Sequence, residues 1–228
     1  KLYIADVHHR YETALNYRNY CRENGISKPG DPQDFQMIYL VDMEHPGLVV
    51  FPTHRLVRDL PNFDKEAVLE KCSEFFYIDE KEGTDTMEED LKKLYDEGKK
   101  AFGFYCGKGE WFLLTLKNID FMSQMLPNVS KASQSLDVSV LHTLILEKIF
   151  GIDKENMAKQ INLTYTKFFT EAIDGVDKGE FQCSFVLNPT RVTEIRDVAA
   201  AGEKMPQKST YFYPKMITGM VMNNLGVD

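Results

Sequence analysis

The sequence predicts an α+β fold in which a mixed or mostly antiparallel sheet is flanked by helices. Short apolar segments alternate with amphipathic segments of helical spacing, in an order too irregular for a doubly wound sheet. The clearest pair of strands, residues 101–106 and 110–116, is joined by a tight turn containing Gly107, Lys108 and Gly109. At 228 residues the chain is long enough for one unit with a true core. We expect any subdivision to fall near residues 118–135.

The first half of the chain contains four segments that are short, apolar and rich in β-branched or aromatic residues, as strands are: residues 2–4, 37–43, 48–51 and 75–78. Three helices are predicted in this half: one that begins at residue 11, and two at residues 61–74 and 86–98. Asn24 and Gly25 would end the first helix, Asp64 would cap the second, and Thr86 with Glu89 fits a capping box. The connectors 26–36 and 79–90 are rich in glycine, proline or carboxylates, which indicates solvated loops. Residues 44–47 predict a hairpin turn.

In the second half, residues 118–134 predict an irregular polar linker. A strongly amphipathic helix follows at residues 137–150, and on it we interpret His142 as structural. Trp111 is expected in the core or half-buried. The remaining elements alternate between strand and helix: strand 161–166, helix 167–175, strand 181–187 and helix 191–201, which stops at Gly202.

Composition and charge exclude several classes of protein. A formal net charge of −8 argues against a nuclease or any extended nucleic-acid surface, which needs a basic excess. No apolar run approaches the length of a membrane span, and the first residues do not have the pattern of a signal peptide. The cysteines are widely scattered: Cys21, Cys72, Cys106 and Cys183. We therefore expect reduced thiols in a cytoplasmic protein with neither nucleic acid nor membrane as a partner.

Polar chemistry is densest near the start of the chain, where Asp6, His8, His9 and Arg10 precede the first predicted helix. The free N–H groups and positive dipole end of a helix attract anions, and two histidines with an arginine favour phosphate. Asp6 would accept a proton, hold a histidine tautomer or reach a divalent metal. The alternative is a surface turn that ion-pairs with itself. Zinc is disfavoured because no ligand spacing typical of zinc sites accompanies the histidines.

The segment from Tyr3 to Ala14 closely resembles the Y-I-A-D-G-H-H-R-Y-E-T-A signature of domain of unknown function 1015. A second block, from Asn188 to Arg191 and from Ala201 to Lys215, also resembles that family. The signature is in turn similar to a motif of the ParB and sulfiredoxin superfamily, which includes nucleotide-binding partition proteins and free-serine kinases. The resemblance implies that the chain is the C-terminal portion of a longer protein whose N-terminal half is missing.

One departure from the signature is Val7, which stands where the family pattern has glycine. Glycine in such a turn would serve a positive φ or a close backbone approach to phosphate, and a β-branched side chain resists both. The sequence leaves open whether the site is altered here or never needed glycine.

The second block provides further candidates, because its cations and hydroxyl groups suit phosphate recognition: Lys208, Ser209, Thr210 and Lys215. An edge strand with its polar face outward explains the same spacing. Four secondary candidates are Glu12, His54, Arg55 and Tyr213. His54 and Arg55 would face the opening cluster across the sheet, or else form a solvated strand end with His54 hydrogen-bonded to backbone.

These observations predict binding of a nucleotide or phosphorylated small molecule. The superfamily resemblance implies phosphoryl transfer to a small hydroxy acceptor such as an amino acid. Asp6 and His8 would be catalytic, and His8, His9, Arg10 and the Tyr11 N–H would hold phosphate, with Mg²⁺ accompanying a nucleotide or pyrophosphate. The alternative is a non-catalytic regulatory module that senses a nucleotide or anion.

Overall fold

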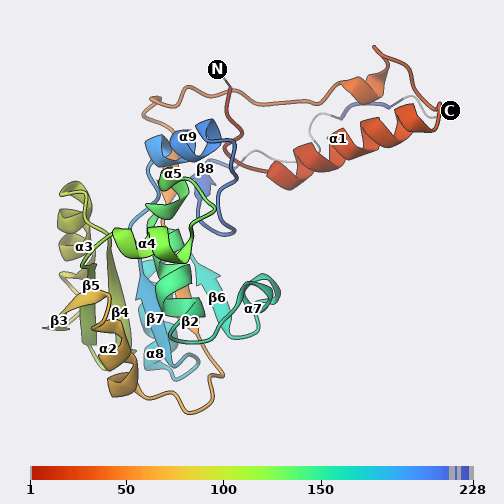
Figure 1. Cartoon of the computed structure of the whole chain (residues 1–228). Helices are drawn as coiled ribbons and strands as arrows, with labels where there is room; N and C mark the ends of the chain where they lie inside the picture. The colour runs from red at the N-terminus through yellow and green to blue at the C-terminus, as the bar shows by residue number, and fades with distance from the viewer. Residues whose placement is uncertain (1, 216–218, 220–221, 226–228) are drawn as a thin grey trace. The chain divides into compact units, whose positions relative to one another are not determined.

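The computed structural model describes residues 2–215, 219 and 222–225 (Figure 1). The chain forms two compact units, which we describe separately. The terminal unit contains residues 1–49 and 212–228, and the sheet unit contains residues 50–211. A subdivision near residues 118–135 stays a prediction.

The terminal unit is built around α1 (His8–Glu23) and the short 3-10 helix η1 (Pro32–Asp34). Arg22 on α1 donates two hydrogen bonds to Asp34, at 2.6 and 2.7 Å, and so ties the connector to the helix. The strands predicted at residues 2–4 and 37–43 are wrong. Residues 37–41 are exposed and form no regular structure, and neither segment has a strand partner among the described residues. Apolar composition alone does not make a strand, which needs a neighbour to satisfy its backbone groups.

The sheet unit contains a six-stranded sheet of order β3-β5-β4-β7-β2-β6, and the predicted α+β fold is confirmed. Every neighbouring pair in it is antiparallel. Its strands are β2 (His54–Val57), β3 (Phe76–Glu82), β4 (Ala101–Gly107), β5 (Glu110–Leu116), β6 (Leu163–Thr166) and β7 (Cys183–Val186). A second sheet pairs β1 (Val49–Phe51) with β8 (Tyr211–Tyr213). β3 continues into residues 79–82, which the sequence predicts as loop, because each of them pairs with β5.

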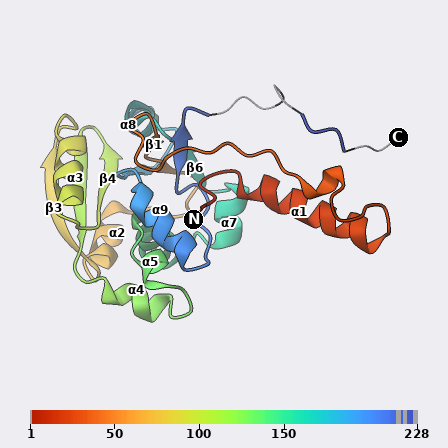
Figure 2. The ribbon, with the colours of Figure 1, turned by 90° about the horizontal axis from the view of Figure 1, so that it is seen from above.

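Side chains alternate along the strands, so the two faces of the six-stranded sheet carry separate hydrophobic clusters. On one face Phe104 stacks on Phe185, with ring centroids 5.0 Å apart. On the other face Trp111, fully buried as expected, packs with Met87 and Leu91. In the view of Figure 2, α8 and α2 lie on opposite sides of the unit. Gly103 permits the close packing of the helix above it, since a Cβ there would lie 3.0 Å from the sulfur of Met87.

The helices of the sheet unit are α2 (Lys65–Cys72), α3 (Met87–Asp96), α4 (Asp120–Met125), α5 (Lys131–Gln134), α6 (Asp137–Val140), the π-helical η2 (Leu141–Glu147), α7 (Lys154–Lys159), α8 (Phe169–Asp177) and α9 (Val192–Ala200). Asp64 caps α2 as predicted, accepting from the Ala67 N–H at 2.8 Å. The predicted capping box of α3 is wrong, because the Thr86 hydroxyl bonds to Asp90 instead.

The predicted linker at residues 118–134 is also wrong, since it contains α4 and α5. Ser130 caps α5, and the buried Gln134 donates to the carbonyl oxygens of Leu126 and Val129. Polar side chains thus pair with backbone groups at and between these short helices, which is why the segment lacks a simple apolar pattern. Across the described parts of both units, none of the helices combines the length and apolar character of a membrane span.

Candidate functional site

The chain turns sharply into α1 at Val7, whose backbone has φ 56° and ψ 35°. This is the left-handed region, which glycine adopts without cost and a β-branched residue does not. The signature that residues 3–14 resemble has glycine at this position, and glycine suits the positive φ that the turn has here. Val7 adopts it nonetheless, with its side chain exposed.

The first turn of α1 leaves two backbone donors unpaired. Val7 donates to the Asp6 carboxylate at 2.8 Å, and the N–H groups of Arg10 and Tyr11 point to the Val7 carbonyl. Among the described residues, neither the His8 nor the His9 N–H makes a hydrogen bond, and no side chain caps the helix. The positive end of a 16-residue helix is therefore available to an anion.

The side chains around this turn are mostly solvated. His9 is exposed, and its Nδ1 lies 3.7 Å from a Glu12 carboxylate oxygen. Asp6 forms an ion pair with Lys215, which is 209 residues away in sequence. The structure thus brings together two predicted site residues from opposite ends of the chain. Tyr213, another candidate in this unit, is half exposed.

Arg55, in the sheet unit, is fully buried. It donates to the carbonyl oxygens of Thr53 and Lys208, the latter at 3.0 Å, and lies 3.2 Å from Nε2 of His142. Its guanidinium stands 5.5 Å from the ring centroid of Tyr165. No carboxylate among the described residues pairs with it, and burial lowers its pKa to about 10. A buried guanidinium without a counter-ion is costly, so its hydrogen bonds must hold it in place.

His54 and Arg55 are not a solvated strand end, and that interpretation is wrong. His54 is 2% exposed, and its Nδ1 accepts a hydrogen bond from the Leu187 N–H at 3.2 Å. The expected backbone bond is present, but inside the protein. Burial, and then the charge of Arg55, lowers the pKa of His54 to about 4. The same causes place the pKa of His142 well below its usual value, so both rings are neutral near pH 7.

The turn that carries Lys208 and Ser209 is fastened to this buried arginine. Besides the Arg55 bond to the Lys208 carbonyl, Thr190 donates to the Ser209 carbonyl at 2.8 Å. Ser209 is buried, and its hydroxyl donates to the Pro206 carbonyl at 2.7 Å. The exposed Lys208 ammonium lies 6.0 Å from the Tyr165 ring centroid. Ser209 therefore builds the turn, and Lys208 with the partly exposed Thr210 is presented by it.

The predicted site residues thus form two groups. The terminal unit contains the first group: Asp6, His8, His9, Arg10 and Lys215. The sheet unit contains the second group: His54, Arg55, Lys208, Ser209 and Thr210. Sequence reasoning missed the partnership of Arg55 with His142 and Tyr165. The available signal was a histidine on the apolar face of a predicted helix, which needs a buried polar partner. Within the described residues, no cluster of three His, Cys, Asp or Glu side chains could hold a metal ion.

Several solved structures are similar to this chain. A conserved hypothetical protein from Pyrococcus furiosus is 19% identical, with a TM-score of 0.46, and the match covers 92% of this chain and 68% of that one. A free serine kinase in complex with AMP is 15% identical, with a TM-score of 0.42, over 75% of this chain and 56% of the kinase. A mutant of a free serine kinase in complex with ADP is 14% identical, with a TM-score of 0.43, over 76% and 57%.

The chain therefore spans a little more than half the length of these kinase chains. No curated protein matches the chain. A family model does match residues 1–139, which are more than half of the 228 and include the whole opening motif. The chain belongs to the family described as protein of unknown function DUF1015.

Proposed function

We propose that this protein binds a nucleotide or another phosphorylated small molecule at the N-terminus of α1. One observation carries the proposal: the N–H groups of His8 and His9, which have no partner in the described part of the chain, begin a helix whose first residues are two histidines and an arginine. Backbone donors, imidazole N–H groups and a guanidinium are the groups that bind phosphate oxygens in proteins.

The finer proposal is phosphoryl transfer to a small hydroxy acceptor such as an amino acid. Phosphoryl transfer depends on positioning and on neutralising the charge of the phosphate. His8, His9 and Arg10 would supply positive charge and donors, and Mg²⁺ would arrive with the nucleotide. Asp6 would accept the proton of the acceptor hydroxyl. For this role the Lys215 ammonium must leave the Asp6 carboxylate, and it would then be available to a phosphate oxygen.

Calorimetric titration of ATP, CTP and pyrophosphate, each with magnesium, tests the binding site. We expect saturable heat with at least one of them, and Arg10→Ala should weaken that binding by about tenfold or more, because a charge-assisted hydrogen bond is lost.

The matched control is Arg18→Ala, which removes an arginine from the same helix two turns further on. Arg18 donates to the neighbouring Asn19 and lies away from the N-terminus. It should leave the affinity unchanged. Equal losses of affinity in the two variants would mean that Arg10 acts only through the net charge of the protein. No heat with any of the three ligands would contradict the proposal.

A second candidate function is a regulatory module that binds the same anion without turning it over. The observations that favour it are the left-handed Val7 and the ion pair that occupies Asp6. Incubating the protein with ATP, magnesium and candidate hydroxy acceptors separates the two. Release of ADP that depends on the acceptor would support the kinase, and nucleotide binding without such release would support the regulatory module.

A further inference from the structure

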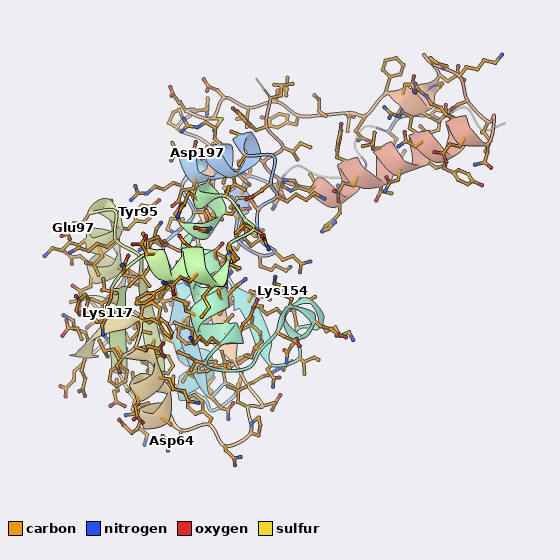
Figure 3. The ribbon with its side chains drawn as sticks, in the orientation of Figure 1. Asp64, Tyr95, Glu97, Lys117, Lys154 and Asp197 are labelled. Carbon is orange, nitrogen blue, oxygen red and sulfur yellow. The ribbon has the colours of Figure 1, made fainter. Side chains whose placement is uncertain are left out.

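The sheet unit contains a cavity of about 290 Å³ where β2 begins and β7 ends. One wall is a face of α3 with side chains at helical spacing, including Leu91 and Tyr95. Tyr95 is labelled in Figure 3. The opposite wall is formed by His54 at the start of β2 and by Val186 to Pro189 at the end of β7. The cavity therefore lies between regular elements, and its position does not depend on the terminal unit.

The walls of this cavity are held in place by polar contacts behind them. Asn188 donates from its side-chain amide to the Leu91 carbonyl at 2.9 Å, which joins the end of β7 to α3. The Arg191 guanidinium stacks on the Tyr95 ring, 3.9 Å from its centroid, and also donates to the Tyr95 carbonyl. Since both walls are anchored, the cavity is a preformed space, as small-molecule sites usually are.

His54 gives the cavity one specific polar group. Its Nδ1 accepts from the Leu187 N–H, so the hydrogen of the neutral ring is on Nε2. That Nε2–H is buried, and among the described residues it has no hydrogen-bond partner. Buried donors are nearly always paired, so this N–H, without a partner among the described residues, indicates a missing acceptor.

Charge limits the kind of molecule that fits. Lys92 and Glu88 also line the cavity with opposite charges, and Lys92 is paired with Asp96, so no net positive charge remains to compensate an anion. The neutral His54 cannot compensate one either. Most of the remaining lining is apolar, including Leu91, Val186 and Pro189. Burying an unpaired anion among these groups would be unfavourable.

We propose that this cavity is a second ligand site, which binds a small, uncharged and mostly apolar molecule through a carbonyl-type oxygen that accepts a hydrogen bond from Nε2 of His54. The site is independent of phosphate binding at α1, so either proposal can fail without the other.

Three probes of nearly equal size test it by NMR titration of the isotopically labelled chain. Acetophenone carries a carbonyl oxygen, α-methylstyrene replaces that oxygen with a CH₂ group, and benzoate is an anion. We expect acetophenone to bind with a dissociation constant on the order of millimolar, given its size. It should shift the Leu187 amide and the His54 ring nitrogens. α-Methylstyrene and benzoate should bind about tenfold more weakly, because one lacks the acceptor and the other is charged.

Two variants test whether the probes bind in this cavity and through His54. His54→Asn keeps an oxygen that can accept from the Leu187 N–H but removes the Nε2–H, so acetophenone should lose its advantage over α-methylstyrene. Leu91→Phe fills the space from α3 and should abolish binding of both. Equal affinity of the two probes for the unaltered protein, shifts centred away from Leu187, or no binding near saturation of the probe would each overturn the proposal.

Discussion

Val7 stands where the signature that residues 3–14 resemble has glycine, and its backbone lies in the left-handed region. A non-glycine residue in the left-handed region loses about 1–2 kcal/mol, and the greater flexibility of unfolded glycine offsets about half of that. The position is exposed, so no packing contact explains the valine.

Val7→Gly should therefore raise the free energy of unfolding by up to about 1 kcal/mol, as measured by urea denaturation. Val7→Ala is the matched control, because alanine keeps the strained φ and should give little or no gain. If alanine stabilised the protein as much as glycine, removal of the β-branch and not relief of backbone strain would be responsible.

At the scale of single elements, the N-cap residues of α2 and α3 can be compared directly. Both helices begin at a residue type favoured at N-caps, but only Asp64 accepts a bond from the helix it precedes. The sequence cannot distinguish them, since Thr86 with Glu89 fits the capping-box spacing as well as Asp64 fits a simple cap. What separates them is the backbone of Thr86, which is already helical (φ −97°, ψ −4°), whereas that of Asp64 is extended.

We expect Asp64→Ala to lower the free energy of unfolding by about 1 kcal/mol, and Thr86→Ala to lower it by much less. Asp64→Asn should retain most of the stability, because the amide oxygen can still accept from the Ala67 N–H. Thermal and urea unfolding of the three variants side by side would check this order. A larger loss at Thr86 than at Asp64 would show that its bond to Asp90 supports α3 more than the cap supports α2.

Elements also gain positions that their own sequence does not specify. The turn around Lys208 and Ser209 follows α9, yet its place is set by Arg55 on β2 and by Thr190. Of the candidate residues there, Ser209 holds the turn and Lys208 is displayed by it. A hydroxyl and a cation that look equivalent in sequence therefore differ in their environment.

For the whole molecule, the two histidines next to Arg55, His54 and His142, predict how the free energy of unfolding depends on pH. An unfolded histidine titrates near pH 6.5, whereas the pKa of folded His54 is about 4 and that of His142 also lies well below 6.5. As the pH falls from about 6.5 towards 4, the unfolded state binds more protons than the folded state. The free energy of unfolding should therefore decrease on acidification, by about 3 kcal/mol for His54 alone over the whole interval.

Urea unfolding between about pH 7 and pH 5 measures this decrease above the range in which most carboxylates titrate. His54→Asn should have a flatter profile than the unaltered protein, whatever its stability at pH 7. Parallel profiles for the two proteins would mean that His54 is protonated to the same extent when folded and unfolded.

The sequence by itself determined the features that depend on neighbours in the chain. The hairpin of β4 and β5 has the predicted strands and glycine turn, and α1 ends where Asn24 and Gly25 indicate. The fold class follows from the same short-range patterns. The grouping of histidines and arginine at the start of α1 is also local, because consecutive residues must lie close together. Whether that group binds phosphate stays a prediction.

Strand pairing and burial depend on contacts between residues far apart in the chain, and only the tertiary structure decided them. It left residues 37–43 outside any strand of the described residues, although they are as apolar as the strands of the core. It buried Arg55 beside His142 and the Lys208 carbonyl, which are 87 and 153 residues away, and it enclosed His54 between β7 and α3. Periodicity shows which side chains share a face of one element, but burial depends on which other element covers that face, and no local pattern contains that information.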